Sequence, residues 1–227
     1  MFDEMLSGLD GKSRVPYRKL MAWLEQQDLK KLSKQSALAE ELFRRVGITF
    51  NVYGDKDAEE RLIPFDLVPR ILAAEEWQRL EKGIVQRVAA INAFLSDVYH
   101  RQEIVKAGVV PSDLINKNRA FLPQMCGFTP PGNIYTHIIG VDVVRTGVDE
   151  FFVLEDNARV PSGVSYMIEN RSTMLHMFPE LFASHSIKPV GNYPKQLFNT
   201  LVESAESLSD DPNIVVLTPG IHNSAYY

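Results

Sequence analysis

Two apolar runs separated by a turn constrain the fold of this chain more than any other feature. The runs are Ile138 to Val144 and Phe151 to Leu154, and the segment between them, Thr146-Gly-Val-Asp149, has the composition of a turn. The pattern therefore predicts a β-hairpin. Pairing the strands about this turn gives three opposed pairs: Val144 with Val153, Asp142 with Glu155, and Gly140 with Asn157.

The predicted register places two carboxylates and an amide on one face of the hairpin. Directly opposed residues have Cβ atoms about 4.5–5.5 Å apart, so Asp142 and Glu155 would repel each other. Their oxygens, with the carbonyl of Asn157, are hard ligands that suit Mg²⁺ or Mn²⁺. Gly140 leaves room opposite Asn157 for a ligand. The alternative is a surface hairpin whose acids are simply solvated.

The neighbours of the acids favour the metal site. In the same register both faces of the hairpin are mostly apolar, which predicts a sheet covered on both sides. Charges in such a setting need partners. A slip of one residue would move the whole set to the other face. The residues expected beside the acids are Ile138, Val144, Phe151 and Val153, and those expected on the other face are Ile139, Val141, Val143, Phe152 and Leu154.

The hairpin also resembles a known family. Gly140-Val-Asp142, a short turn and then Leu154-Glu-Asp-Asn-Ala-Arg159 look like the metal-binding end of the ATP-grasp ligases. More narrowly, the circularly permuted ATP-grasp proteins, relatives of glutathionylspermidine synthetase, have strings similar to residues 153–171, 63–70 and 217–227. The likeness spans roughly residues 48 to 227.

The resemblance implies a fold and a reaction. The fold is α/β (α+β), an ATP-grasp-like mixed sheet with helices packed on it, in circularly permuted order. The reaction is ATP-dependent amide formation, in which a small-molecule carboxylate becomes an acylphosphate and an amine then displaces phosphate. Asp142, Glu155 and Asn157 would hold Mg²⁺ against the phosphates of ATP. Arg159 and Arg171 would meet the charge on the transferring group, although Arg171 could instead pair with Glu169 or Glu180.

Two loops are candidates for contacts with phosphate or substrate. Ser162-Gly163 precedes a helix, whose N-terminus can hold an anion, or Ser162 only caps that helix. Asn223 and Ser224 follow an apolar run at Asn213 to Thr218 that predicts a buried strand. In open α/β sheets, ligands bind at the carboxyl ends of the strands. His222, beside them, could equally be a loop residue without a functional role.

Two departures from the family pattern keep other functions open. Many ATP-grasp enzymes have an arginine two residues before the metal-binding aspartate, where this chain has Gly140. A glycine-rich loop with phosphate-binding lysines is also missing, and after permutation it should follow Tyr227, so we expect an incomplete piece of a longer protein. The rival functions are a non-catalytic descendant that binds nucleotide or carboxylate, and a Mg²⁺-dependent phosphohydrolase.

Composition favours a soluble, cytoplasmic protein. A net charge of −5 and no basic patch argue against nucleic acid as a partner. No apolar run reaches the length of about 18 residues that a membrane span needs. The single Cys126 excludes an internal disulfide. The sequence leaves open the acid and amine substrates and the oligomeric state.

The remaining expectations concern organisation along the chain. Residues 1–110 should form a mainly helical part with a short strand, and residues 111–227 the metal-binding hairpin and an α/β part, unless both make one domain. Residues 1–15 should be a loosely held arm. Expected helices are Tyr17 to Gln27, Ser36 to Arg45, about thirty residues from Ala73 to a stop at Gly108, Val164 to His176, and Pro194 to Leu208.

Overall fold

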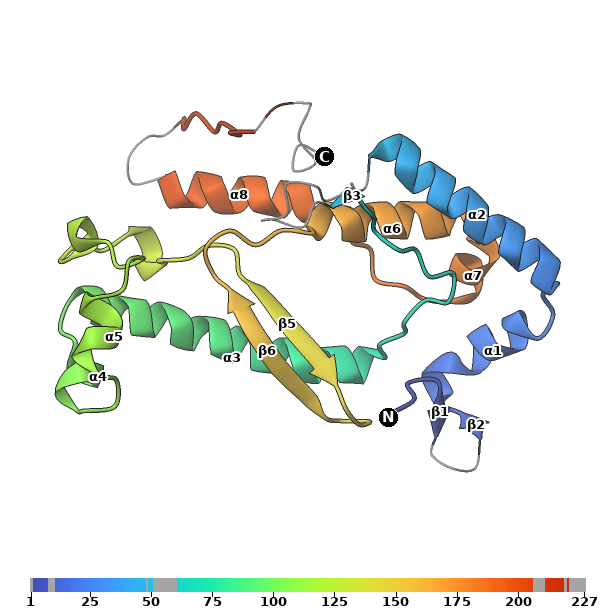
Figure 1. The fold of residues 1–227 in the computed structure, drawn as a ribbon, viewed down its shortest axis with the longest axis horizontal. Coiled ribbons are helices and arrows are strands. Elements are labelled where there is room, and N and C mark those ends of the chain that lie inside the picture. The colour runs from blue at the N-terminus through green and yellow to red at the C-terminus, as the bar shows by residue number, and fades with distance from the viewer. Residues whose placement is uncertain are drawn as a thin grey trace. The chain divides into compact units, whose positions relative to one another are not determined.

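The computed structural model describes residues 2–7, 11–47, 49–50, 61–205, 211–218 and 220. Within these residues, helices combine with two-stranded antiparallel sheets (Figure 1). The expected α+β class is confirmed. The chain divides into two compact units: the first is Met1–Ala73, Ser162–Gln196 and Ile214–Tyr227, and the second is Ala74–Pro161 and Leu197–Asn213. The boundary expected near residue 110 stays a prediction.

The helices and strands have the following bounds. The α-helices are α1 (Arg18–Leu24), α2 (Leu29–Val46), α3 (Ala74–Tyr99), α4 (Glu103–Lys106), α5 (Ser112–Asn116), α6 (Val164–Met177), α7 (Pro179–Ser184) and α8 (Tyr193–Ala205). Short 3-10 turns lie at Val15–Tyr17, Pro123–Met125 and Pro131–Asn133. The paired strands are β1 (Leu6–Ser7) with β2 (Lys12–Ser13), β3 (Thr49–Phe50) with β4 (Arg61–Leu62), and β5 (Gly140–Arg145) with β6 (Phe151–Asn157).

The N-terminal residues are held more firmly than expected. Strands β1 and β2 pair, and the backbone N–H of Arg14 donates to the carbonyl of Met5 at 2.8 Å. The Arg14 side chain also donates to the carbonyl of Glu4 at 2.8 Å. The expectation of a loose arm is therefore wrong for the described part of residues 1–15, because these backbone groups find partners locally.

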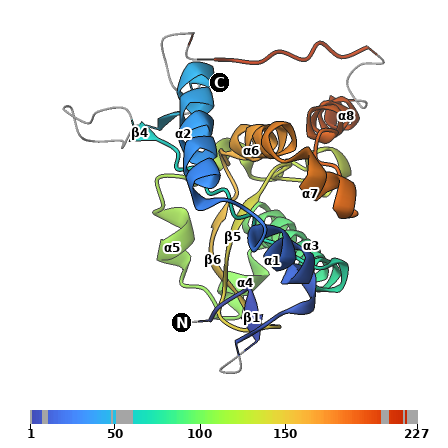
Figure 2. The same cartoon turned by 90° about the vertical axis from the view of Figure 1, so that its right-hand side faces the viewer.

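An aromatic core holds the first unit together. Phe43 of α2 meets the Phe65 ring edge-on at 5.0 Å, and Trp23 of α1 meets Phe178 in the same way at 5.2 Å. Figure 2 shows α2 beside α6, and both helices contribute to this core. The buried members are Tyr17, Leu20, Ala39, Phe43, Phe65, Met174, Phe178 and Leu181.

Helix α2 starts earlier than expected because of a cap. The Asp28 side chain accepts a hydrogen bond from the backbone N–H of Lys30, so the helix begins at Leu29 and not at Ser36. Gly47 ends it in the left-handed region at φ 80°. Helix α6 agrees with its expected range to within a residue.

The second unit is built on α3, which is shorter than the thirty residues expected. It ends at Tyr99, and Gln102 then takes a left-handed conformation at φ 51°. The Asp97 carboxylate accepts from the backbone N–H groups of Glu103 and Ile104 at 2.8 and 2.9 Å. These bonds start the separate helix α4 and lower the pKa of Asp97.

The strand expected at Asn213 to Thr218 is not found. Residues 211–218 are described without regular structure, and none of the described strands pairs with them. Leu217 is 94% exposed, so the segment is not buried either. An apolar run becomes a strand only when another strand satisfies its backbone groups, and its composition does not guarantee that partner.

Candidate functional site

The β5–β6 hairpin forms and keeps the two pairings on which the candidate site depends. Asp142 lies opposite Glu155, and Gly140 lies opposite Asn157, as the sequence predicted. The expected pairing of Val144 with Val153 is wrong: the register shifts next to Asp142, and the turn side of the hairpin pairs Val143 with Val153 and Val144 with Phe152.

The register shift leaves Leu154 of β6 without an opposed residue on β5. It makes a β-bulge, in which two residues of one strand oppose one of the other. The loop explains the bulge, because it runs from Thr146 to Glu150 and is one residue longer than the turn in the sequence. Arg145 holds this loop by donating to the carbonyl of Gly147 at 2.9 Å and to that of Val148. The bulge then restores the expected register at the acids.

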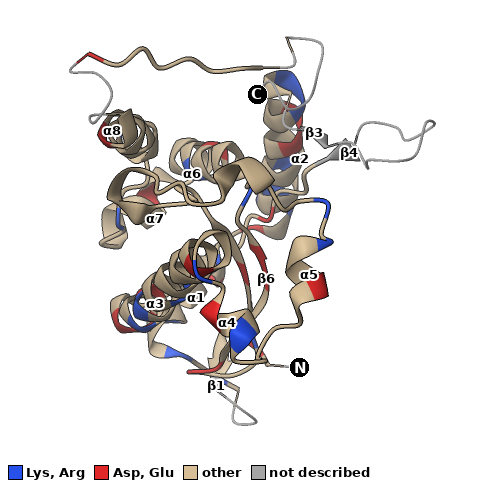
Figure 3. Ribbon diagram, turned by 90° about the vertical axis from the view of Figure 1, so that its left-hand side faces the viewer, with Lys and Arg blue, Asp and Glu red and all other residues tan. Residues whose placement is uncertain are grey.

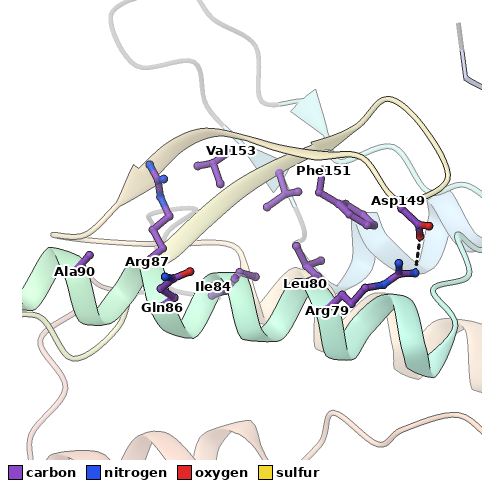
Figure 4. Close-up of a pocket in the computed structure, with 11 residues that line it drawn as sticks. Arg79, Leu80, Ile84, Gln86, Arg87, Ala90, Asp149, Phe151 and Val153 are labelled. Atoms are coloured by element: carbon purple, nitrogen blue, oxygen red, sulfur yellow. Dashed lines mark ion pairs between the residues drawn. The ribbon is translucent and has the colours of Figure 1, made fainter.

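One face of the hairpin packs against α3. Phe151 and Val153 point toward the helix (Figure 4). With Val143 and with Leu80 and Ile84 of α3, they line a groove of about 540 Å³. Phe151 and Val153 are therefore not neighbours of the acids, which is a correction to the predicted faces. The bulge is the cause, since it shifts the pairing of the residues before it by one position.

The other face carries the acids and is not covered. Phe152, paired with Val144, lies on this face and is 57% exposed, and Val144 is 39% exposed. The prediction of a sheet covered on both sides is wrong for the described residues of this chain. Within the second unit, this face is therefore open to a ligand.

The three proposed metal ligands lie together on the open face. Glu155 and Asn157 project from β6, and the amide nitrogen of Asn157 donates to a carboxylate oxygen of Glu155 at 3.1 Å. Asp142 is opposite Glu155 and, like it, exposed. Acidic residues colour β6 red in Figure 3. A Cβ added to Gly140 would lie 3.2 Å from the Cβ of Pro161, so the backbone is approached closely here.

This donor set fits a hard divalent cation. Two carboxylates and one amide oxygen are ligands of the kind that Mg²⁺ uses, with water and phosphate oxygens completing its shell. Among the described residues, no group of three or more His, Cys, Asp and Glu side chains is arranged to hold a metal. The candidate centre therefore depends on the amide of Asn157 and on ligands from outside the protein.

The two candidate arginines have different environments. Strand β6 ends at Asn157, and Arg159 lies in an exposed bend just beyond it. Arg171 of α6 donates to the carbonyl of Lys188 at 2.9 Å and lies over the ring of Phe182. Arg171 thus stabilises its own unit, and its alternative partner Glu180 accepts instead from the indole of Trp23 at 3.2 Å.

The two candidate anion-binding loops are described unequally. Gly163 occupies the N-cap position of α6 with φ 93°, and no side chain caps the helix there. The alternative role of Ser162 as a cap is therefore wrong. Ser162 and Gly163 belong to the first unit, whereas the metal candidates belong to the second. Asn223 and Ser224, with His222, lie outside the described residues.

Asp156, between Glu155 and Asn157, faces the opposite way. Arg87 of α3 grips its carboxylate: Nε donates to the two oxygens at 2.7 and 2.9 Å, and a terminal nitrogen donates at 2.6 Å. The hydrogen bond from Arg87 lowers the pKa of Asp156, and the same bond raises the pKa of Arg87. No local sequence pattern predicts this pair, because its members are 69 residues apart.

The sequence of this chain is similar to that of a known protein family. Residues 69–227 match the family model described as a circularly permuted ATPgrasp. The match covers more than half of the chain, which therefore belongs to the circularly permuted ATP-grasp family. The fold class and the resemblance expected from the hairpin are both confirmed at this level.

Relatives match over the whole chain. An uncharacterised protein of Synechocystis sp. is 44% identical over 226 residues, all of this chain and 47% of that protein. One of Mycobacterium tuberculosis is also 44% identical, with 40% of its length covered. A Frankia alni protein named "Putative glutamate--cysteine ligase 2-3" is 38% identical, with 26% of its length covered. The chain thus spans less than half the length of these curated relatives.

The helices of the structure can be compared with the requirements of a membrane span. In the part of the chain that is described, no helix combines the length and apolar character that a membrane crossing requires. The expected cytoplasmic location stays a prediction.

Proposed function

We propose that this chain supplies the magnesium-binding end of an ATP-dependent carboxylate–amine ligase. The observation that carries the proposal is the arrangement of Asp142, Glu155 and Asn157 on one open face of the hairpin, within a chain of the circularly permuted ATP-grasp family. Neither part suffices alone, because an acidic hairpin without the family context is commonly a solvated surface.

Asp142, Glu155 and Asn157 would hold Mg²⁺ or Mn²⁺. A divalent ion bound there would neutralise charge on the β- and γ-phosphates of ATP. The hydrogen bond between the amide of Asn157 and Glu155 orients both side chains in advance. In phosphoryl transfer such positioning and charge neutralisation account for most of the catalysis.

The reaction has two displacements. An oxygen of the substrate carboxylate attacks the γ-phosphorus of ATP, the bond to the bridging oxygen of ADP breaks, and an acylphosphate forms. The amine nitrogen then attacks the acyl carbon, loses a proton, and inorganic phosphate leaves with the electrons of the broken C–O bond. The net products are an amide, ADP and phosphate.

The arginines and the glycine turn would handle the transferring group. Arg159 lies two residues beyond Asn157 in an exposed bend, where its guanidinium can meet the developing charge. Arg171 would be a second contact only if it left the carbonyl of Lys188. The N-terminal N–H groups of α6, after Ser162 and Gly163, would contact phosphate or substrate, and Asn223 and Ser224 would add hydrogen bonds.

One observation favours a second candidate function. Gly140 stands where many ATP-grasp enzymes have an arginine, and the space beside it is already taken by Pro161. A descendant that binds nucleotide or a carboxylate without turnover would tolerate that change. The two functions differ in a measurable way, because only the ligase releases ADP in proportion to both substrates.

The test is ADP release by the intact protein with Mg²⁺ and a panel of acids and amines. The names of the Frankia relatives make glutamate and cysteine the first pair to try. ADP release that requires both an acid and an amine supports the ligase. Nucleotide binding without release supports the binding descendant, and phosphate release that needs no acceptor supports a phosphohydrolase.

A further inference from the structure

Strand β6 carries two adjacent carboxylates, Glu155 and Asp156, and its register decides which of them faces α3. Successive residues of a strand point to opposite faces, so either Glu155 or Asp156 can face α3, but not both. If the bulge at Leu154 were lost, Val141 would pair with Glu155 in place of Asp156. Glu155 and Asn157 would then turn toward the helix, and the open face would keep only Asp142 and Asp156.

The contact that distinguishes the two arrangements comes from α3. Arg87 makes a forked contact with both oxygens of Asp156, and the Asp156 side chain is partly buried, with 19% of its surface exposed. The planar fork of a guanidinium matches a carboxylate only in a narrow range of positions. In the slipped register Glu155 would stand at the same position opposite Val141, but its side chain is one methylene longer and its carboxylate would lie beyond the place that the fork matches. A lysine would bind either acid.

Two further ion pairs join the same face of α3 to the loop side of the hairpin, where the pairing is the same in both arrangements. Glu76 pairs with Arg145 near the loop, and Arg79 pairs with Asp149 within it (Figure 4). From Glu76 to Arg87 the helix rises by about 16 Å at 1.5 Å per residue. From Arg145 to Val141, the partner of Asp156, strand β5 advances by about 13 Å, because Leu154 in the bulge adds a residue to β6 without advancing the pairing. The side chain of Arg87 spans the remaining few ångströms and reaches the position opposite Val141, where it contacts Asp156.

We propose that Arg87, acting through Asp156, locks the register of β6 and so keeps Glu155 and Asn157 on the open face. Arg87 and Asp156 are positioning residues, because they lie on the opposite face from the three ligands and contact none of them in the contacts described. The consequence for metal binding depends on the proposed function; the register itself does not.

Disulfide trapping measures the register directly. In a Cys126→Ser background, the pair Asp142→Cys and Glu155→Cys reports the observed register, and Val141→Cys with Glu155→Cys reports the slipped one. Disulfides form only between residues whose Cα atoms lie close together. With Arg87 present, the first pair should cross-link and the second should not. Arg87→Met should lower the first yield by about half or more and raise the second about fivefold.

Arg79 provides a matched control for Arg87. Arg79 is on the same helix and also pairs with an aspartate of the hairpin, but at the loop. Arg79→Met should leave both yields as they are in the parent. If Arg87→Met prevents folding, Arg87→Lys keeps the charge without the fork and should show a smaller shift in the same direction. Unchanged yields in the Arg87 variants, or equal shifts in Arg79→Met, would overturn the proposal.

Mn²⁺ binding by the intact protein separates this proposal from the proposed function. Titration followed by electron paramagnetic resonance should show about tenfold weaker binding in Arg87→Met, a typical cost of losing a group that orients metal ligands. If Glu155→Gln binds Mn²⁺ like the parent, the metal role of the hairpin is wrong, while the cross-links still decide the register. If the cross-links shift and Mn²⁺ affinity does not, the register lock stands and its link to the metal fails.

Discussion

The guanidinium of Arg145 is paired with the carboxylate of Glu76 and is wholly shielded from solvent, with its side chain 0% exposed. It also stacks on the ring of Phe151 and donates to two carbonyls of the hairpin loop. One buried cation thus fixes the loop, the start of β6 and the first turns of α3. Any variant that removes the carboxylate leaves this charge buried.

We predict that Glu76→Gln destabilises the protein by about 3–5 kcal/mol, the usual cost of removing one partner of a buried ion pair. Urea unfolding followed by circular dichroism measures the change. Its neighbour Glu75 is exposed, so Glu75→Gln should change stability by less than about 0.5 kcal/mol. Equal losses in the two variants would show that Glu76 contributes nothing through Arg145.

The same substitution at two glycines should have opposite effects. Gly83 lies inside α3, and a Cβ added there meets nothing within 4 Å, so Gly83→Ala should stabilise the protein by about 0.5–1 kcal/mol. Gly108 also has open space, but its φ is +71°. An alanine there is strained, and Gly108→Ala should destabilise. Thermal unfolding of the two variants compares them, and a loss of stability in Gly83→Ala would contradict the open groove beside it.

The acid pair was predictable from the sequence because the alternation of a strand is strict. Once a hairpin is expected between residues 138 and 157, Asp142, Glu155 and Asn157 fall on one face in the register that also pairs Gly140 with Asn157. The family strings supported the same residues independently. This part of the candidate site needed only local pattern.

The bulge was not predictable, and it caused the errors about the faces. Phe151 to Leu154 is apolar at every position, so no alternation marks where one residue is left over. The length of the loop depends on Arg145, whose grip on the Gly147 and Val148 carbonyls is a feature of the folded chain. The pair of Arg87 and Asp156 could not be predicted from the sequence either, because packing on α3 determines which face Asp156 occupies.

The early start of α2, in contrast, had a signal that could have been used. Asp28 is a preferred N-cap residue directly before a helical run, and the structure uses it in that role. Most of the residues from Leu29 to Gln35 are polar, with Leu29 and Leu32 the exceptions, so the apolar periodicity there is weak. A prediction that depended on periodicity alone placed the start of the helix too late.

The Asp97 contacts give a pH dependence with a definite sign. Hydrogen bonds from the backbone N–H groups of Ile104 and Glu103 lower the pKa of Asp97 in the folded protein. Its stabilising contribution is therefore fully present above the unfolded pKa of about 3.9 and is lost as the pH falls through the lower folded value. Asp97→Asn should lower stability at pH 7 and pH 5 by similar amounts, and the difference from the parent should shrink toward pH 2. Urea unfolding across this range measures it; a difference that grows as the pH falls would mean that the carboxylate is not the stabilising form.

Glu155 provides the most direct check of the candidate metal centre. Replacing it by glutamine keeps the size of the side chain and a hydrogen-bond acceptor for Asn157, but removes one of two opposed charges. We predict that Glu155→Gln in the intact protein lowers Mg²⁺-dependent ADP release by about a hundredfold or more, as expected when charge stabilisation of the transition state is lost.

The matched control for this change is Glu150→Gln. Glu150 is an exposed carboxylate of the same hairpin, in the loop where it accepts a hydrogen bond from the hydroxyl of Thr146 at 3.1 Å. Its variant should keep activity within about twofold of the parent, because surface changes away from a site have small effects. In the metal-free state, Glu155→Gln should be at least as stable as the parent, since the repulsion between Glu155 and Asp142 is relieved. Normal turnover by Glu155→Gln at limiting Mg²⁺ would show that the open face of the hairpin does not hold the metal.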